Sequence, residues 1–207
     1  MNLIKLFETP KIIGVVADQN EGKSNLIYHL VDELRQYKCR IFAYGLRSRL
    51  VGVNEIYSVE ELEQIRNSIV ILDEFDNLFD LDNRKITKQI EKSIRLIFHN
   101  NNVLLLCGLG ENFKKFVSAK LHYLIFKKIT FADLVNGSRV KSIIMQYNGL
   151  EKGMSVINIP KNECIIFDGN HYTKLIIPLM KDFDSKAENV PIIVQKNYVQ
   201  KCAKAKI

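Results

Sequence analysis

The residues best suited to chemistry occupy positions 17 to 24. The chain there reads Ala17-Asp18-Gln19-Asn20-Glu21-Gly22-Lys23-Ser24, a phosphate-loop pattern in which alanine replaces the usual first glycine. A loop that joins a strand to a helix points its backbone N–H groups inward, at the positive end of the helix dipole. The segment therefore predicts a cradle for the phosphates of a nucleotide.

The last three residues of this loop suit a bound Mg-ATP. Gly22 lets the main chain approach the phosphates, Lys23 reaches the β- and γ-phosphates, and the Ser24 hydroxyl ligates Mg²⁺. The tripeptide alone is not specific, but it follows an apolar run of strand length and opens an amphipathic stretch, which is the context the motif requires. Ala17 is compatible with the loop if its φ is negative. We therefore expect ATP and Mg²⁺ as cofactors, and a catalytic role for Lys23.

Two carboxylates follow the next-but-one apolar run. Residues 69–72 are apolar, and Asp73 and Glu74 come directly after them. We expect this strand to lie beside the strand that precedes the phosphate loop, where Asp73 holds a Mg²⁺-bound water. Glu74 then orients or deprotonates the attacking water, which predicts a hydrolase rather than a nucleotide switch.

The strand after the acidic pair is expected to end in a polar residue that senses the γ-phosphate. The segment 104–110 offers no such residue, and the first polar side chains after it are Glu111 and Asn112. Asn112 is our sensor candidate, and a helix-cap role explains it equally well.

Strands and helices alternate through the first two thirds of the chain, which predicts βαβ crossovers in an α/β fold: a P-loop NTPase with a mostly parallel central sheet flanked by helices. The helices are predicted from apolar residues at helical spacing and from a capping box at Ser58. The expected strands cover 12–16, 40–44, 68–72, 103–107 and 123–129, and the expected helices cover 23–36, 58–66 and 86–98.

The pattern changes after about residue 136. Short alternating segments over 139–147, 154–159, 163–167 and 173–177 are broken by the turn pairs Asn136-Gly137, Asn148-Gly149 and Asp168-Gly169. We expect a C-terminal antiparallel β extension. The predicted organisation is a P-loop core over 1–135, a β-rich extension of the same domain over 136–194, and a basic tail over 195–207 that is a candidate for disorder.

Composition is that of a soluble globular protein, with 47% hydrophobic and 26% charged residues among 207. No apolar run approaches the ~18 residues of a membrane span, and the N-terminus has no signal-peptide pattern. The four cysteines form no C-x-x-C pair, so we expect neither a zinc knuckle nor a disulfide framework. These features predict a cytoplasmic protein.

The net charge of +7 and pI of about 9.1 favour a polyanionic partner. Residues 114–141 hold seven basic side chains and one acid, and a predicted helix carries a second basic group, the 85–95 stripe, on one face. Such surfaces suit contacts with double-stranded DNA phosphates that ignore sequence, although a solvated helix face explains the stripe as well. The DNA-binding candidates are Lys85, Lys88, Lys92, Lys114 and Lys115; Arg95 completes the stripe.

In these motifs the chain resembles the HerA/FtsK-type ATPases, and in particular the small genome-packaging ATPases of tailless, membrane-containing double-stranded DNA viruses. The similarity depends on residues 17–24, on Asp73-Glu74 and on the compact size, and it covers about residues 10–190. It implies a DNA-translocating ring, a hexamer around DNA, working in the host cytoplasm or the virion. A capsid or membrane vertex protein is the further partner that the resemblance suggests.

Two departures from that family are visible. Cys107 stands where a glutamine or other polar sensor is common, and no arginine stands out as the finger that a neighbouring subunit inserts. The finger candidates are Arg84, Arg95 and Arg139, for which Lys120 would substitute only in part.

Other functions remain open. Thymidine-type nucleoside kinases also combine a phosphate loop with an acidic-aromatic strand end like Asp73-Glu74-Phe75, but they usually carry a cysteine-rich zinc lobe that this chain lacks. A filamentous-phage assembly ATPase would normally need a membrane segment. A regulatory, non-enzymatic nucleotide-binding module is disfavoured by Glu74.

Overall fold

A computed structural model describes residues 3–37, 39–46, 49–75, 84–109, 113, 119–129, 139–150, 156 and 158–179, with the backbone alone over 84–91, 139–141 and 148–150. The tail over 195–207 and the sensor candidate Asn112 lie outside these ranges.

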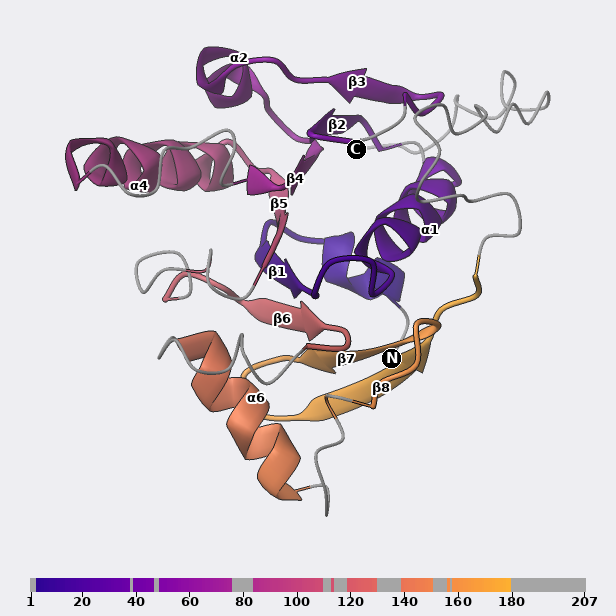
Figure 1. Cartoon of the computed structure of the whole chain (residues 1–207). Helices are drawn as coiled ribbons and strands as arrows, with labels where there is room; N and C mark the ends of the chain where they lie inside the picture. Colours follow the sequence, from indigo (N-terminus) through magenta and orange to yellow (C-terminus); the bar gives the residue numbers. More distant parts are fainter. Residues whose placement is uncertain are drawn as a thin grey trace.

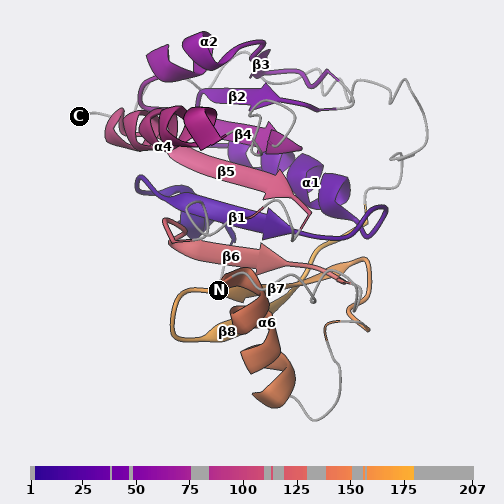
Figure 2. The same cartoon turned by 60° about the vertical axis from the view of Figure 1, so that its left-hand side comes forward.

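One eight-stranded sheet runs through the molecule in the order β3-β2-β4-β5-β1-β6-β7-β8 (Figure 2). The strands from β3 to β6 pair in parallel, and β7 and β8 add an antiparallel hairpin beyond β6. The predicted fold class, a mostly parallel sheet with a C-terminal antiparallel addition, is confirmed. The strands are β1 (Ile12–Val16), β2 (Ile41–Tyr44), β3 (Val53–Glu55), β4 (Ile69–Asp73), β5 (Val103–Gly108), β6 (Tyr123–Phe126), β7 (Glu163–Phe167) and β8 (Tyr172–Ile176).

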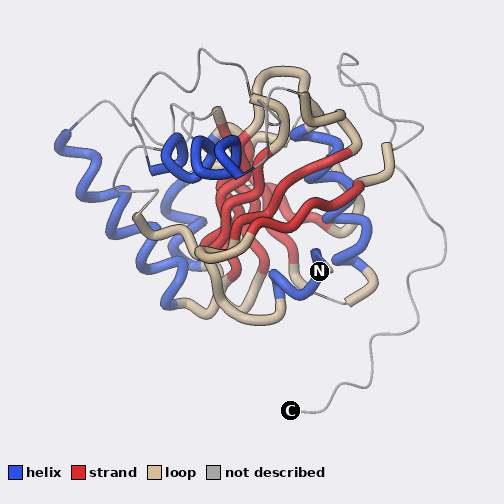
Figure 3. Tube along the Cα trace, turned by 90° about the horizontal axis from the view of Figure 1, so that it is seen from below, coloured by secondary structure: helices blue, strands red, loops and turns tan. Residues whose placement is uncertain are grey.

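Helices cover both faces of the sheet (Figures 1 and 3). On one face α1 (Lys23–Arg35) and the short 3₁₀ helix η1 (Leu3–Phe7) enclose a buried apolar cluster. On the other face lie α2 (Val59–Gln64), α4 (Arg84–His99) and α6 (Arg139–Leu150). Because both faces are covered, β1, β4 and β5 are buried along their whole length, which explains their continuous apolar runs.

The strand order corrects one expectation. The acidic strand β4 does not lie beside the phosphate-loop strand β1, because β5 pairs with both of them. Cys107 of β5 is consequently in register with Val15 on one side and with Asp73 on the other.

Residues 139–147 were expected to form a strand. This prediction is wrong, because residues 139–150 form the helix α6. Ile144 and Tyr147, three residues apart, are buried, whereas Met145 between them is exposed, as a helix requires. The Tyr147 ring packs against Phe126 of β6 and Tyr172 of β8. Packing onto the sheet therefore overrides the local alternation.

The hairpin expected around Asp168-Gly169 is confirmed. The Asp168 carboxylate accepts hydrogen bonds from the backbone N–H groups of Asn170 and His171, and Gly169 takes a φ of +103°. Of the segment 154–159, the described residues do not form a strand. The short β3 and the helix η1 were not predicted, since neither has a clear apolar period.

Candidate nucleotide site

The phosphate loop leaves β1 at Val16 and enters α1 at Lys23. Gly22, the N-cap of α1, takes a φ of +85° and makes no side-chain cap hydrogen bond. The first N–H groups of an α-helix lack acceptors within the helix, so this end of α1 is suited to binding an anion. Ala17 is buried and its φ is not positive, so the missing first glycine is sterically acceptable.

The loop and the acidic strand meet directly. Lys23 Nζ lies 3.0 Å from Asp73 Oδ1, and the two side chains are 13% and 5% exposed. Burial raises the pKa of the Asp73 carboxyl, and the positive charge of Lys23 opposes that rise. The two residues are 50 positions apart in sequence (73 − 23) and are brought together because parallel strands end at the same edge of the sheet.

Glu74 has an unusual backbone. Its φ is +51°, and its N–H donates to Asp73 Oδ1 at 3.1 Å. A left-handed conformation costs a non-glycine residue about 1–2 kcal/mol, and such strain concentrates at functional sites. Glu74 is half-buried at this end of β4, on the same edge as the phosphate loop.

Gly45 is a site residue that sequence reasoning missed. It follows β2 with a φ of +76°, and a Cβ added there would lie 2.2 Å from the Asp73 carbonyl oxygen. Only a residue without a side chain fits this approach, so Gly45 allows the end of β4 to take its shape. The sequence does show a glycine at the end of a predicted strand. Its role could not be inferred from that alone, because the sequence does not show that β2 and β4 are neighbours.

The position expected to carry a sensor holds Cys107. Its side chain is fully buried, and burial together with the nearby Asp73 raises the pKa of the thiol well above its usual range. The thiol is therefore neutral.

The predicted finger and DNA-binding residues are only partly described. Lys92 and Arg95 are exposed on α4, opposite the buried Ile94 and Ile97. The side chains of Arg84, Lys85, Lys88 and Arg139 lie outside the described residues, as do Lys114 and Lys115 entirely.

The donor set suits Mg²⁺. A carboxylate and a hydroxyl, from Asp73 and Ser24, are hard oxygen ligands, and Mg²⁺ completes its shell with water and phosphate oxygens rather than with a protein cage. The described residues contain no cluster of three or more His, Cys, Asp or Glu side chains that could hold a metal ion. Within the same ranges, no helix combines the length and apolar character needed to cross a bilayer.

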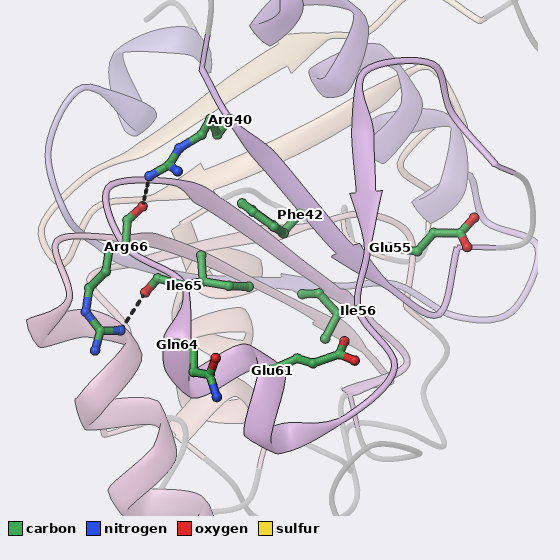
Figure 4. A pocket seen from close by; sticks show the side chains of 8 residues that line it. All are labelled: Arg40, Phe42, Glu55, Ile56, Glu61, Gln64, Ile65 and Arg66. Atoms are coloured by element: carbon green, nitrogen blue, oxygen red, sulfur yellow. Dashed lines mark hydrogen bonds between the residues drawn. The ribbon is translucent and has the colours of Figure 1, made fainter.

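A separate hollow of about 400 Å³ lies at the other end of β2 (Figure 4). Its floor is apolar, formed by Phe42, Ile56 and Ile65, and its rim carries two arginines that are engaged with backbone carbonyls: Arg40 with that of Arg66, and Arg66 with those of Glu63 and Ile65. None of the phosphate-loop residues lines it.

No known family model matches the sequence, and no curated protein matches it. Solved structures do match. The chain is similar to B204, the DNA-packaging ATPase from Sulfolobus turreted icosahedral virus, with a TM-score of 0.61 and 15% identity over 82% of this chain and 98% of that one. It is similar to the genome-packaging NTPase B204 of Sulfolobus turreted icosahedral virus 2 in complex with ATP-γS, with a TM-score of 0.58 and 18% identity over 82% and 98%.

A third match is the pCW3 conjugation coupling protein TcpA with ATP-γS, with a TM-score of 0.57 and 13% identity over 84% of this chain and 62% of that one. The chain has the fold of these packaging and coupling ATPases. The resemblance expected from the motifs is thus confirmed at the level of the fold.

Proposed function

We propose that this protein is a Mg-dependent ATPase that moves double-stranded DNA, with genome packaging in a virus as its specific task. The observation that carries the proposal is the 3.0 Å contact between Lys23 of the phosphate loop and Asp73 of the acidic strand, at the edge where the parallel strands end. That contact joins the two motifs that a P-loop hydrolase needs, and it occurs in a fold shared with DNA-packaging ATPases.

Each site residue has a chemical role in this proposal. The loop 17–24 binds the phosphates through its backbone N–H groups, and Lys23 neutralises charge on the β- and γ-phosphates. Ser24 and Asp73 hold Mg²⁺, which when bound offsets charge on the phosphate oxygens. Glu74 accepts a proton from the attacking water.

The finer parts of the proposal concern assembly. We propose a ring, a hexamer with DNA in its channel, in which Arg84, Arg95 or Arg139 reaches the site of a neighbouring subunit. Of these, Arg95 is described as exposed. The protein would act in the host cytoplasm or the virion, beside a capsid or membrane vertex protein. Asn112 remains the sensor candidate.

One assay tests the activity and its main alternative. ATP turnover is measured with and without long double-stranded DNA, and separately with thymidine as phosphoryl acceptor. Turnover that rises with DNA supports the motor, whereas phosphorylation of thymidine without DNA stimulation would replace it with a kinase.

A charge reversal tests the DNA contact. Lys92→Glu on α4 is compared with Lys5→Glu on η1, because both lysines are exposed and both changes alter the net charge equally. Lys92→Glu should reduce DNA stimulation and the salt dependence of DNA binding, whose log–log slope is roughly −0.9 per phosphate contacted. Combining it with Lys88→Glu should increase the loss. Equal stimulation in the Lys92 and Lys5 variants would remove the stripe from the proposed channel.

A further inference from the structure

A fully buried lysine lies beside the phosphate loop. Lys127 follows β6 directly, and its side chain has no exposed surface. Its Nζ donates hydrogen bonds to the backbone carbonyls of Lys161 at 2.6 Å and Glu163 at 3.0 Å. Lysine is among the residues least often buried, because its charge loses hydration there.

The ammonium lies behind the glycine of the loop. A Cβ added to Gly22 would come within 3.0 Å of Lys127 Cε and 3.3 Å of its Nζ. The surrounding backbone is joined at two points, since Lys127 N–H donates to the Val16 carbonyl at 3.0 Å and Asp18 N–H donates to the Lys128 carbonyl at 3.2 Å. The strand β6 lies next to β1, so residues 127–128 run alongside the loop (Figure 2).

The charge of Lys127 is left without a carboxylate partner among the described residues. The two acids near it are Glu21, which pairs with Lys128 at 3.1 Å, and Glu163, which pairs with Lys174 at 2.6 Å. Burial lowers the pKa of the Lys127 ammonium, and the neighbouring Cys164, Glu21 and Glu163 oppose that shift. The two backbone carbonyls that accept hydrogen bonds from Lys127 therefore offset the lost hydration of its buried ammonium.

A purely structural role, in which Lys127 only links backbone segments through its hydrogen bonds, explains this buried lysine less well. A neutral side-chain donor would satisfy a carbonyl without the desolvation cost of a charge. The charge is useful where an anion binds nearby, and Lys127 packs against Gly22 of the loop that has the anion-binding geometry.

We propose that Lys127 is a second electrostatic determinant of nucleotide binding: a positioning residue that supports Gly22 from behind and adds an unneutralised positive charge to the phosphate loop. It does not touch the nucleotide. It raises affinity in proportion to the phosphate charge of the ligand, so ATP gains more than AMP. This inference depends on the proposed ATPase function.

The experiment compares three variants by calorimetric titration with ATP and with AMP. Lys127→Met removes the charge and both donors, Lys127→Gln removes the charge but keeps a donor for one carbonyl, and Lys5→Met removes an exposed charge far from the loop. Both Lys127 variants should bind ATP about tenfold more weakly than the wild type, with a smaller loss for AMP. Lys5→Met should bind like the wild type.

Two outcomes would overturn the inference: affinity restored in Lys127→Gln, which indicates a hydrogen-bonded tie, or the same loss for ATP and AMP. If the wild type itself fails to bind ATP, the proposed function fails instead.

If the Lys127 variants do not fold, a variant at another position tests the same proposal. Lys174→Met, on the exposed edge of β8, frees the Glu163 carboxylate to offset Lys127. It should weaken ATP binding about threefold relative to Lys5→Met. Equal ATP affinity in these two variants would contradict the proposal.

Discussion

The six parallel strands and the β7–β8 hairpin belong to one sheet but differ in what they supply. Parallel strands end at a common edge, so the loop after β1, Gly45 after β2 and Asp73 at the end of β4 converge there. An antiparallel hairpin brings only one of its ends to that edge, and the turn at 168–171 lies at the other. The hairpin side contributes main-chain carbonyls to Lys127. We infer that side-chain chemistry comes from the parallel strands, and that the hairpin contributes support.

The largest effect should come from the acidic pair. Glu74→Gln keeps the size of the side chain but cannot accept a proton from water, so turnover should fall about 100- to 10,000-fold while ATP affinity stays within a fewfold. Steady-state ATPase rates and nucleotide titration measure the two quantities. If Glu74→Gln turns over within a fewfold of the wild type, the base lies elsewhere, with Glu111 as the next candidate.

The next effect concerns the phosphate loop itself. Lys23→Ala removes a charge-assisted contact and should weaken Mg-ATP binding roughly 10- to 100-fold. It also leaves the buried Asp73 carboxylate without its 3.0 Å partner, so the thermal midpoint should fall as well. Lys5→Ala is the control for lost charge. Unchanged ATP affinity in Lys23→Ala would contradict the phosphate-loop assignment.

A smaller effect is expected when glycines with positive φ are replaced by alanine. Comparing two such variants distinguishes the effect of backbone strain from the effect of displacing the acidic pair. Gly45 and Gly52 have φ values of +76° and +79°, but a Cβ at Gly45 meets the Asp73 carbonyl at 2.2 Å, whereas at Gly52 the nearest atom is 3.9 Å away. Both alanine variants should lose stability because of their left-handed φ, and Gly45→Ala should lose more because its Cβ also clashes with the Asp73 carbonyl. Only Gly45→Ala should lower kcat, roughly tenfold, since a displacement near 1 Å costs up to about 100-fold. Equal kcat values in the two variants would remove Gly45 from the site.

The smallest effect should lie in the hairpin turn. Backbone N–H groups of His171 and Asn170 lower the pKa of Asp168, so its stabilisation is present above the ordinary aspartate pKa and is lost as pH falls through the lowered value. Asp168→Ala should cost less than about 1 kcal/mol at pH 7, because the carboxylate is exposed. The difference in thermal midpoint should shrink as the pH falls through the lowered pKa of Asp168 and disappear below it. ATP affinity should not change in this variant. A change would contradict the inference that the parallel strands supply the chemistry and the hairpin only supports them.

Sequence reasoning succeeded where local pattern and environment agree. The apolar runs at 12–16, 69–72 and 103–107 form strands covered on both faces, and the segment 17–24 joins a strand to a helix as expected, while the roles of its residues stay predictions. It failed where the answer depends on distant neighbours. The helix 139–150 depends on packing of Tyr147 against Phe126 and Tyr172, and the strand order and the role of Gly45 depend on which strands pair.

The position of β5 between β1 and β4 sets the distance between the ends of these two strands. Strands in a sheet lie about 4.8 Å apart, so the ends of β1 and β4, two spacings apart, are separated by roughly 10 Å. A separation of one spacing, about 5 Å, would leave less room between the loop and the carboxylate for a phosphoryl group, a hydrated cation and an attacking water. Two spacings leave that room, and the distance also explains the length of the side chain that bridges it. Lys23 reaches Asp73 across β5 because it is long. A shorter cationic side chain starting from the same helix end could not span the gap.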